Sequence, residues 1–208
     1  IKRGANLYDP ETVKDTIARQ KWCPGRKENA VHAYSSFLKM VGGKWDPPRY
    51  QRVAKLPWVP TESEIDQLIA GCSRRIATFL QLLKETGMRP GEAWALKWTD
   101  LDFENSNVRI TPEKGSNPRI LRLSNTLIAM LKTLPQKNEY VFKNGLLRHF
   151  ADGFSQQRKR MANELRNPRI NMITFKTFRH FKGTMEYHRT KDILHVMEVL
   201  GHKNIKNT

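Results

Sequence analysis

The sequence predicts a mainly α-helical protein that carries one small antiparallel β-sheet. Apolar residues recur at helical spacing over much of the chain, as at Ile65, Leu68 and Ile69. Between Trp98 and Leu123 the apolar period falls to two residues, and turn-forming Gly, Asn, Ser and Pro separate three short runs. Short strands with such connections are typical of an antiparallel meander. The predicted fold class is therefore α+β with helices in the majority.

The start of the chain predicts two helices. Asp9 and Pro10 suit the cap and the first turn of a helix that ends near Lys21. A second helix is expected over 27–41, where apolar side chains return at helical spacing. The piece 1–41 is too short to bury a large core, so we interpret it as part of a small helical domain.

A linker is predicted over 42–60, which reads GGKWDPPRYQRVAKLPWVP. Its two glycines and four prolines make a helix or a strand unfavourable. The domain boundary is placed in this stretch, and the second, larger domain is expected to span 61–208.

Capping signals predict where the helices of the larger domain begin and end. Thr61 to Glu64 reads TESE, a capping box at the start of a helix. Gly87 and Gly201 stand where a C-cap glycine belongs. The other elements are expected as follows: helices at 74–85, 125–134, 149–165, 174–188 and 192–200, a short helix after Pro90, strands at 98–103, 107–111 and 119–123, and a strand or connector at 140–142.

The charge of the chain favours a polyanionic partner. It has 37 lysine and arginine residues against 20 aspartate and glutamate residues, a formal net charge of +17. These cations are spread along the chain, as on a folded surface that follows nucleic-acid phosphates. A solvated basic surface or a ribosome-type contact are the alternatives.

The two cysteines, Cys23 and Cys72, belong to no Cys/His cluster, so we expect reduced intracellular thiols and neither a metal nor a cofactor. No stretch approaches the roughly 20 apolar residues of a membrane span, and no signal peptide is present. The first residue is Ile, which indicates a removed start or an excerpt of a longer chain.

Five cationic side chains stand at unusual places and fit phosphoryl transfer without a metal: Arg89, Lys114, Lys176, Arg179 and His202. Guanidinium forks bind phosphate oxygens bidentately and can stabilise the charge that builds on them. A lysine on a hairpin can protonate a leaving oxygen, and a second lysine or a histidine can hold the proton of the nucleophile. Glu92, three residues after Arg89, is placed to orient it along one helical face. This set contains no nucleophile.

Four motifs together resemble the tyrosine recombinase (phage integrase) family in order and in spacing: ETGMRPGEAWALKWTDLDF, EKGSNPRILRL, TFKTFRH and VMEVLGHKNIKNT. The resemblance covers about 61–208, and 1–41 resembles the end of the helical core-binding domain of the family. It implies an Xer- or integrase-like site-specific recombinase that exchanges DNA strands by transesterification through a 3′-phosphotyrosyl intermediate, without metal or ATP. It also implies a tetramer on paired sites in double-stranded DNA, in the cytoplasm with the nucleoid of a prokaryote, its virus or its plasmid.

The resemblance assigns roles where residues match. Arg89 and Arg179 match the two catalytic arginines of the family. Lys114 matches the hairpin lysine that acts as general acid to the 5′ oxygen, and His202 matches the histidine of the Leu-Gly-His motif. Two supporting positions also match: Glu92 and His180.

Two departures from the family pattern affect the chemistry. Lys176 stands where the family usually has a histidine, and it needs a lowered pKa to act as a base, which burial beside two arginines would supply. A contact to the DNA backbone is the alternative for this lysine. The nucleophilic tyrosine normally follows the Leu-Gly-His run closely, so we expect it just beyond Thr208 and interpret Tyr187 as structural. The chain is therefore predicted to be truncated, to bind DNA and to lack strand cleavage.

Further cations are expected to contact DNA: Lys44, Arg49, Arg52, Lys55, Arg119, Arg158 and Arg160. Two alternative functions stay open. A type IB topoisomerase shares the arginine, lysine and histidine set, and a non-catalytic DNA-binding protein could keep the same fold.

Overall fold

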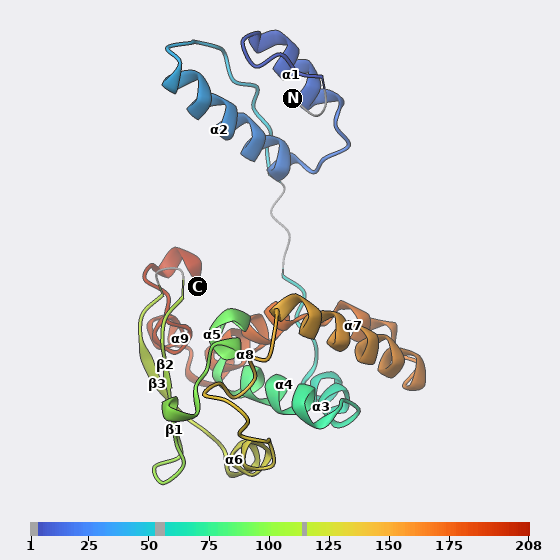
Figure 1. Cartoon of the computed structure of the whole chain (residues 1–208), viewed down its shortest axis with the longest axis vertical. Coiled ribbons are helices and arrows are strands. Elements are labelled where there is room, and N and C mark those ends of the chain that lie inside the picture. Colours follow the sequence, from blue (N-terminus) through green and yellow to red (C-terminus); the bar gives the residue numbers. More distant parts are fainter. Residues whose placement is uncertain (1–3, 53–56, 114–115) are drawn as a thin grey trace. The chain divides into compact units, whose positions relative to one another are not determined.

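The computed structural model describes residues 4–52, 57–113 and 116–208 (Figure 1). Two of the predicted site residues, Lys55 and Lys114, lie outside this described part. The chain divides into two compact units, Ile1–Leu56 and Pro57–Thr208. The predicted linker 42–60 contains the point of division.

The smaller unit is built on two helices, α1 (Pro10–Arg19) and α2 (Pro24–Met40). The Asp9 side chain caps α1 by accepting a hydrogen bond from the backbone N–H of Glu11. Helix α2 begins three residues before its predicted start, because Pro24 is well suited to a first helical position. The two helices share a small core: Val13, Ile17, Val31, Tyr34 and Leu38.

Helices dominate the larger unit. Their bounds are α3 (Glu62–Ala70), α4 (Arg74–Thr86), α5 (Pro90–Trp94), α6 (Asn125–Lys132), α7 (Leu147–Glu164), α8 (Phe175–Thr190) and α9 (Ile193–Leu200). The predicted capping box at Thr61 and Glu64 is confirmed. Short 3-10 turns at Trp98–Asp100, Pro168–Met172 and Ile205–Asn207 were not predicted.

Helix α4 forms the centre of this unit and packs on α3, α6 and α8. Four of its apolar side chains have no exposed surface: Phe79, Leu80, Leu82 and Leu83. Aromatic rings from four other segments meet the ring of Phe79 edge-on: Trp94, Phe142, Phe150 and Phe175. Helix α4 is therefore held by close packing, and the residues at its C-terminal end rest on a rigid support.

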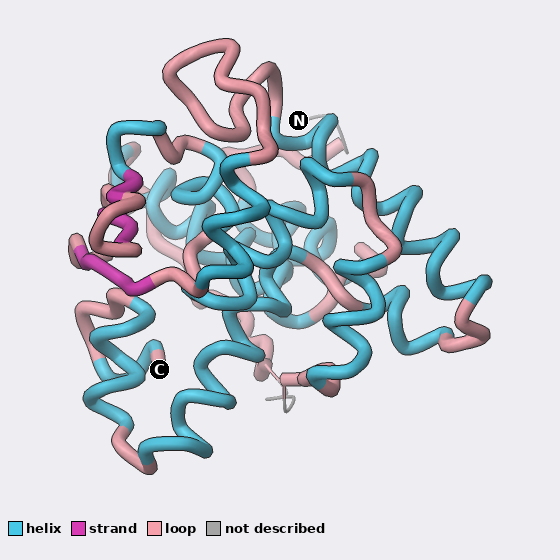
Figure 2. The backbone as a smooth tube through the Cα atoms, turned by 90° about the horizontal axis from the view of Figure 1, so that it is seen from below, coloured by secondary structure: helices cyan, strands magenta, loops and turns pink. Residues whose placement is uncertain are grey.

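Within the described residues the sheet is a meander of β1 (Leu101–Asp102), β2 (Asn107–Ile110) and β3 (Arg119–Arg122), antiparallel throughout. Figure 2 shows the strands in magenta and the helices in cyan. Strand β1 is shorter than predicted, because the backbone N–H of Lys97 bonds to Asp100 at 2.9 Å and closes a 3-10 turn before it. The predicted class, mainly helical with a small antiparallel sheet, is confirmed.

Both predicted C-cap glycines adopt the left-handed conformation that favours glycine, with φ of 61° at Gly87 and 68° at Gly201. These two turns end α4 and α9 and start the segments that carry Arg89 and His202. Among the described helices, none has the length and apolar character to cross a bilayer. No group of three or more His, Cys, Asp or Glu in the described part is arranged to hold a metal ion.

Candidate active site

Arg179 lies at the centre of the candidate site and binds the ends of two helices. From α8, its Nη1 donates to the carbonyl of Gly87 at 2.8 Å and its Nη2 to the carbonyl of Leu200 at 2.6 Å. Carbonyls at helix C-termini lack intrahelical partners and carry partial negative charge, so both stabilise the guanidinium. Burial, and then the charges of Arg89 and Arg119, lower the pKa of Arg179 to about 10, which leaves the side chain charged at neutral pH.

Arg89 is fixed by the carboxylate of Glu92. It stands two residues after Gly87, directly before α5. Its backbone N–H donates to Oε2 of Glu92 at 2.9 Å and its Nη1 donates to Oε1 at 3.1 Å. The orienting contact predicted from the three-residue spacing is therefore present. The side chain of Arg89 keeps 28% of its surface exposed, whereas that of Glu92 is fully buried.

Glu92 also binds two side chains from the segment before and at the start of β3. Arg119 Nη2 donates to Oε2 at 2.9 Å, and Ser116 Oγ donates to Oε1 at 2.7 Å. Burial opposes ionisation of the carboxyl, but these hydrogen bonds and the one from the backbone of Arg89 outweigh it. The pKa of Glu92 is lowered to about 2, so the carboxylate is charged throughout the physiological range.

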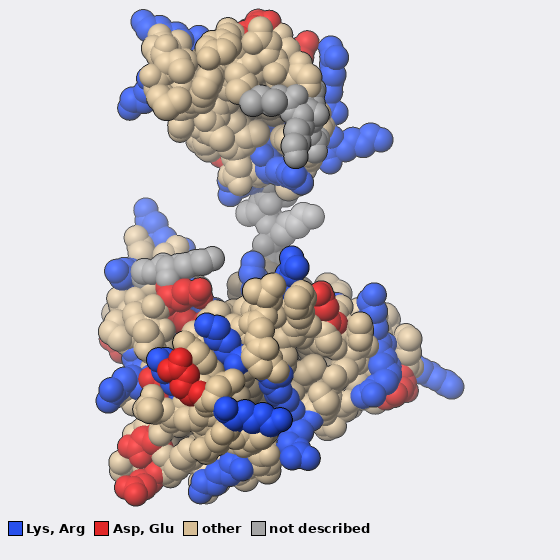
Figure 3. Space-filling view, viewed as in Figure 1, with Lys and Arg blue, Asp and Glu red and all other residues tan. Residues whose placement is uncertain are grey.

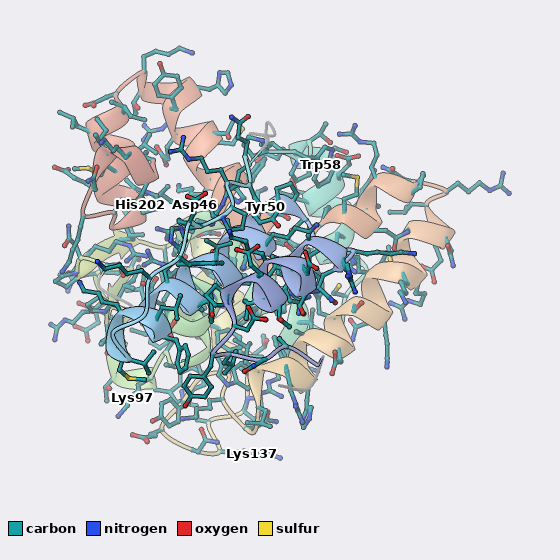
Figure 4. All side chains as sticks on the ribbon, turned by 90° about the horizontal axis from the view of Figure 1, so that it is seen from above. Asp46, Tyr50, Trp58, Lys97, Lys137 and His202 are labelled. Atoms are coloured by element: carbon teal, nitrogen blue, oxygen red, sulfur yellow. The ribbon has the colours of Figure 1, made fainter. Side chains whose placement is uncertain are left out.

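His202 follows the left-handed Gly201 at the end of α9 (Figure 4). The side chain is half-buried, and its Nδ1 lies 2.8 Å from Oγ1 of Thr208. Burial, and then the charges of Arg179, Arg89 and Arg119, lower the pKa of His202 to about 4. The imidazole is therefore neutral at pH 7, where it can still donate one hydrogen bond to an anion.

A hollow of ≈ 320 Å³ opens beside these groups, between α8 and α9. Its polar lining includes Arg179, His180, Tyr187, His202 and Thr208. Three guanidinium groups around one carboxylate leave the cluster with excess positive charge. An anion with several oxygens, such as a phosphate diester, is the ligand that this arrangement favours.

Residues 59–208 match the sequence pattern of the phage integrase family. The chain belongs to this family of tyrosine recombinases. It is 27% identical over 187 residues to the tyrosine recombinase XerA of Pyrococcus horikoshii, an alignment that covers 86% of this chain and 65% of that protein.

Solved structures share the fold of this integrase-family chain. The structure of the XerH site-specific recombinase with its difH substrate superposes with a TM-score of 0.72 at 21% identity, over 96% of this chain and 65% of that one. The Tn1549 transposon integrase in complex with transposon right end DNA superposes with a TM-score of 0.77 at 14% identity, over 98% of this chain and 79% of that one.

Lys176 and His180 lie on α8 beside Arg179, and both side chains are exposed. Lys176 stands one helical turn before Arg179, so the two project from similar sides of the helix. Burial beside two arginines, the expected means of making Lys176 a base, is absent. His180 lines the hollow with Arg179 and His202, as a supporting residue would.

Four of the cations expected to contact DNA are exposed. In the smaller unit these are Lys44, Arg49 and Arg52, the last of which is paired with Glu28. In the larger unit Arg160 is exposed and donates to the carbonyl of Gly71 at 2.6 Å. Positively charged side chains are spread over the face of each unit seen in Figure 3.

Two of the cations expected to contact DNA have contacts inside the protein instead. Arg158 on α7 donates from Nη1 to the carbonyl of Ile173 at 2.6 Å, directly before the start of α8. Arg119 is bound to Glu92, and only 6% of its side chain is exposed. A guanidinium held in this way has little surface left for a DNA phosphate. Both arginines therefore differ from the surface cations that charge alone predicted.

The strand pattern of the sequence indicated an inward position for Arg119, although its positive charge had suggested a place on the surface. Residues 119 and 121 share one face of β3, and the apolar Leu121 on that face and Leu123 just after the strand pack in or against the core. The contact of Ser116 with Glu92 had no such signal, because Ser116 lies in a turn-rich stretch where serine is common.

Proposed function

We propose that this chain is the DNA-acting part of a site-specific recombinase that cuts and rejoins strands of duplex DNA. The observation that supports it is the convergence of Arg89, Arg179 and His202, from three distant segments, on one anion-binding cluster. The XerH and Tn1549 integrase structures are DNA complexes, which is consistent with duplex DNA as the ligand here. We further propose that the protein works as a tetramer on paired sites.

In the proposed reaction the two arginines bind the non-bridging oxygens of one phosphate, and neutral His202 donates a further hydrogen bond. A tyrosine oxygen attacks phosphorus, its bond to phosphorus forms, and the bond from phosphorus to the 5′ oxygen breaks. Lys114 gives a proton to that departing oxygen. The 3′-phosphotyrosyl link keeps the energy of the phosphodiester, so a second transesterification rejoins strands without ATP.

Lys176 fits a contact to the DNA backbone better than a role as base, because its side chain is exposed. A solvated ammonium beside Arg179 adds positive charge where a backbone phosphate would approach. We propose that the tyrosine hydroxyl passes its proton to water instead of to this lysine.

The attacking tyrosine is proposed to lie outside residues 1–208. Tyr187 is the tyrosine that lines the hollow with Arg179 and His202, and 44% of its surface is exposed. Tyr187 is therefore the alternative nucleophile, and a cleavage experiment has to distinguish it from a tyrosine outside residues 1–208. The smaller unit is proposed to be part of a core-binding domain that also contacts the duplex.

The test is recovery of covalent protein–DNA adducts from cells that express the protein from its own gene. The denatured adducts are digested to find the linked amino acid, and sequencing the attached DNA identifies the target site. We expect phosphotyrosine in the wild type and in Tyr187→Phe, and at least a hundredfold less adduct in Arg89→Ala.

Three outcomes would contradict the proposal or part of it. Unchanged adduct formation in Arg89→Ala would reject the assignment of that arginine. Loss of the adduct in Tyr187→Phe would place the nucleophile on α8. Relaxation of supercoiled DNA that lacks paired sites would favour a topoisomerase, and the absence of any adduct would favour a non-catalytic DNA-binding protein.

A further inference from the structure

Residues 116–119 connect two parts of the cation cluster that come from distant segments. Ser116 and Arg119 hold Glu92, which in turn holds Arg89. Between them, the backbone N–H of Asn117 donates to the carbonyl of Gly201 at 3.0 Å. The short segment therefore bonds both to the support of Arg89 and to the residue directly before His202.

Helix α9 is short, and residues from other segments bind its C-terminal end. Its last carbonyl, of Leu200, accepts from Arg179, and the next carbonyl, of Gly201, accepts from Asn117. Carbonyls at a helix C-terminus have no partner within the helix, so donors from other segments decide where this end lies. These two bonds, together with the bond from the backbone N–H of His202 to the carbonyl of Met197 at 2.9 Å, hold His202 in place.

Arg119 fills the space between Glu92 and Gly201. Its Nη2 bonds to Glu92, and a Cβ added at Gly201 would lie 2.7 Å from its Nη1. The Nε of Arg119 is buried, and the described residues give it no hydrogen-bond partner. A buried donor without a partner is costly, so the position of this guanidinium is determined by its other contacts and by packing.

We propose that Arg119 is a positioning residue that keeps Arg89 and His202 in register through Glu92 and the end of α9. The inference rests on the proposed recombinase function. It replaces the expected role of Arg119 as a DNA contact. The exposure of the two arginines agrees with this division, because 28% of the Arg89 side chain is exposed and only 6% of that of Arg119.

The test compares Arg119→Gln with Arg122→Gln in the protein expressed from its own gene. Arg122 lies on the same strand with its side chain exposed, so it controls for the loss of one positive charge on β3. We expect Arg119→Gln to slow strand cleavage about tenfold or more, because a small misplacement of the groups around a phosphate has a large effect on rate. The Kd for duplex DNA should change less than about threefold, since one partly screened charge is removed. Arg122→Gln should leave cleavage unchanged.

A second measurement, made without DNA, is sensitive to the surroundings of His202. The pKa of His202, about 4 in the wild type, is measured by NMR of labelled histidine. Arg119→Gln should raise this pKa, because the histidine loses the positive charge of Arg119 nearby and its place is no longer held. Arg119→Lys keeps the charge but loses the planar fork, so it should keep a low pKa of His202 and still cleave more slowly.

Equal losses of DNA affinity and cleavage in Arg119→Gln would overturn the proposal and restore a direct DNA contact. An unchanged pKa of His202 together with unchanged cleavage would overturn it as well. If Arg119→Gln does not fold by circular dichroism, Arg119→Lys decides: cleavage equal to the wild type contradicts the positioning role. A wild-type protein that forms no adduct would contradict the recombinase function, while the titration of His202 would still test the role of Arg119.

Discussion

At the residue scale, a single buried carboxylate organises the cations of the site. Glu92 accepts hydrogen bonds from Arg89, Ser116 and Arg119, and its side chain has no exposed surface. Like-charged guanidinium groups would repel one another without it. Removal of one member of a buried charge network leaves the others uncompensated, which costs more than a lost surface pair.

Glu92→Gln should therefore destabilise the protein strongly. The amide keeps the size of the side chain but removes the charge and turns an –NH₂ group towards an arginine donor. We expect the free energy of unfolding to fall by about 3 kcal/mol. Urea unfolding followed by circular dichroism measures it.

The control for this substitution is Glu62→Gln. Glu62 is an exposed carboxylate 2.9 Å from Lys84, and such pairs contribute about 0.5 kcal/mol. Equal effects of the two substitutions would show that Glu92 is not the centre of a buried network.

The depressed pKa of His202 predicts a pH dependence of stability. The unfolded chain takes up a proton near pH 6.5 and the folded protein only near pH 4, so the unfolded state binds more protons between these values. Stability is then present above pH 6.5 and is lost as the pH falls towards 4. For a partly exposed group the loss between pH 7 and pH 5 should be roughly 1 kcal/mol.

His202→Gln should remove this part of the pH dependence. Urea unfolding at pH 7 and pH 5 compares the variant with the wild type. A decrease of the same size in both would show that other groups cause the loss.

At the element scale, the site is built where two helices end. Helices α4 and α9 both stop at a left-handed glycine, and Arg179 of α8 binds a carbonyl at each end. Arg89 and His202 follow these turns by a few residues. The packed helices thus set the positions of Arg89, Arg179 and His202. Only short segments separate Arg89 and His202 from the helix ends.

Gly201→Ala should disturb this arrangement. Its φ of 68° is unfavourable for alanine, and the added Cβ would lie 3.0 Å from the backbone oxygen of Asn117. We expect a loss of about 1–3 kcal/mol in the free energy of unfolding. Hydrogen exchange should also become faster in α9.

Gly153→Ala is the matched control, because Gly153 lies inside α7 and a Cβ there meets nothing within 4 Å. Alanine at this position should stabilise the helix by about 0.5–1 kcal/mol. A tolerated Gly201→Ala would contradict a fixed turn before His202.

The elements were predictable from the sequence to different degrees. Strongly amphipathic or capped helices such as α3 and α4 begin where predicted, at Glu62 and Arg74, because local signals and burial agree. Strand β1 was predicted too long, since the 3-10 turn at Trp98 is closed in part by a hydrogen bond from the backbone N–H of Lys97 to the side chain of Asp100. Arg89, Arg179 and His202 were predicted from their motifs, whereas the inward position of Arg119 depends on tertiary contacts that charge does not reveal.

At the scale of the whole molecule, the chain consists of two units with separate cores. The core of the larger unit is formed by residues after Leu56, and that of the smaller unit by residues before it. Both units carry more lysine and arginine than aspartate and glutamate. Each should therefore contribute to salt-dependent affinity for DNA.

Residues 57–208 alone should fold with nearly the Tm of the whole chain, because their core does not depend on the smaller unit. Their affinity for duplex DNA should be lower and should depend less steeply on salt, since fewer phosphates are neutralised. Calorimetry measures the Tm, and fluorescence anisotropy at several salt concentrations measures the affinity for DNA. A fragment that does not fold would contradict the division into independent units.

A crystal structure of this protein with a duplex that carries its target site would test whether Arg89, Arg179 and His202 meet at one phosphate. We expect a single backbone phosphate with oxygens about 3 Å from the guanidinium groups of Arg89 and Arg179 and from the imidazole of His202. DNA bound on another face, or these three groups on different phosphates, would contradict it.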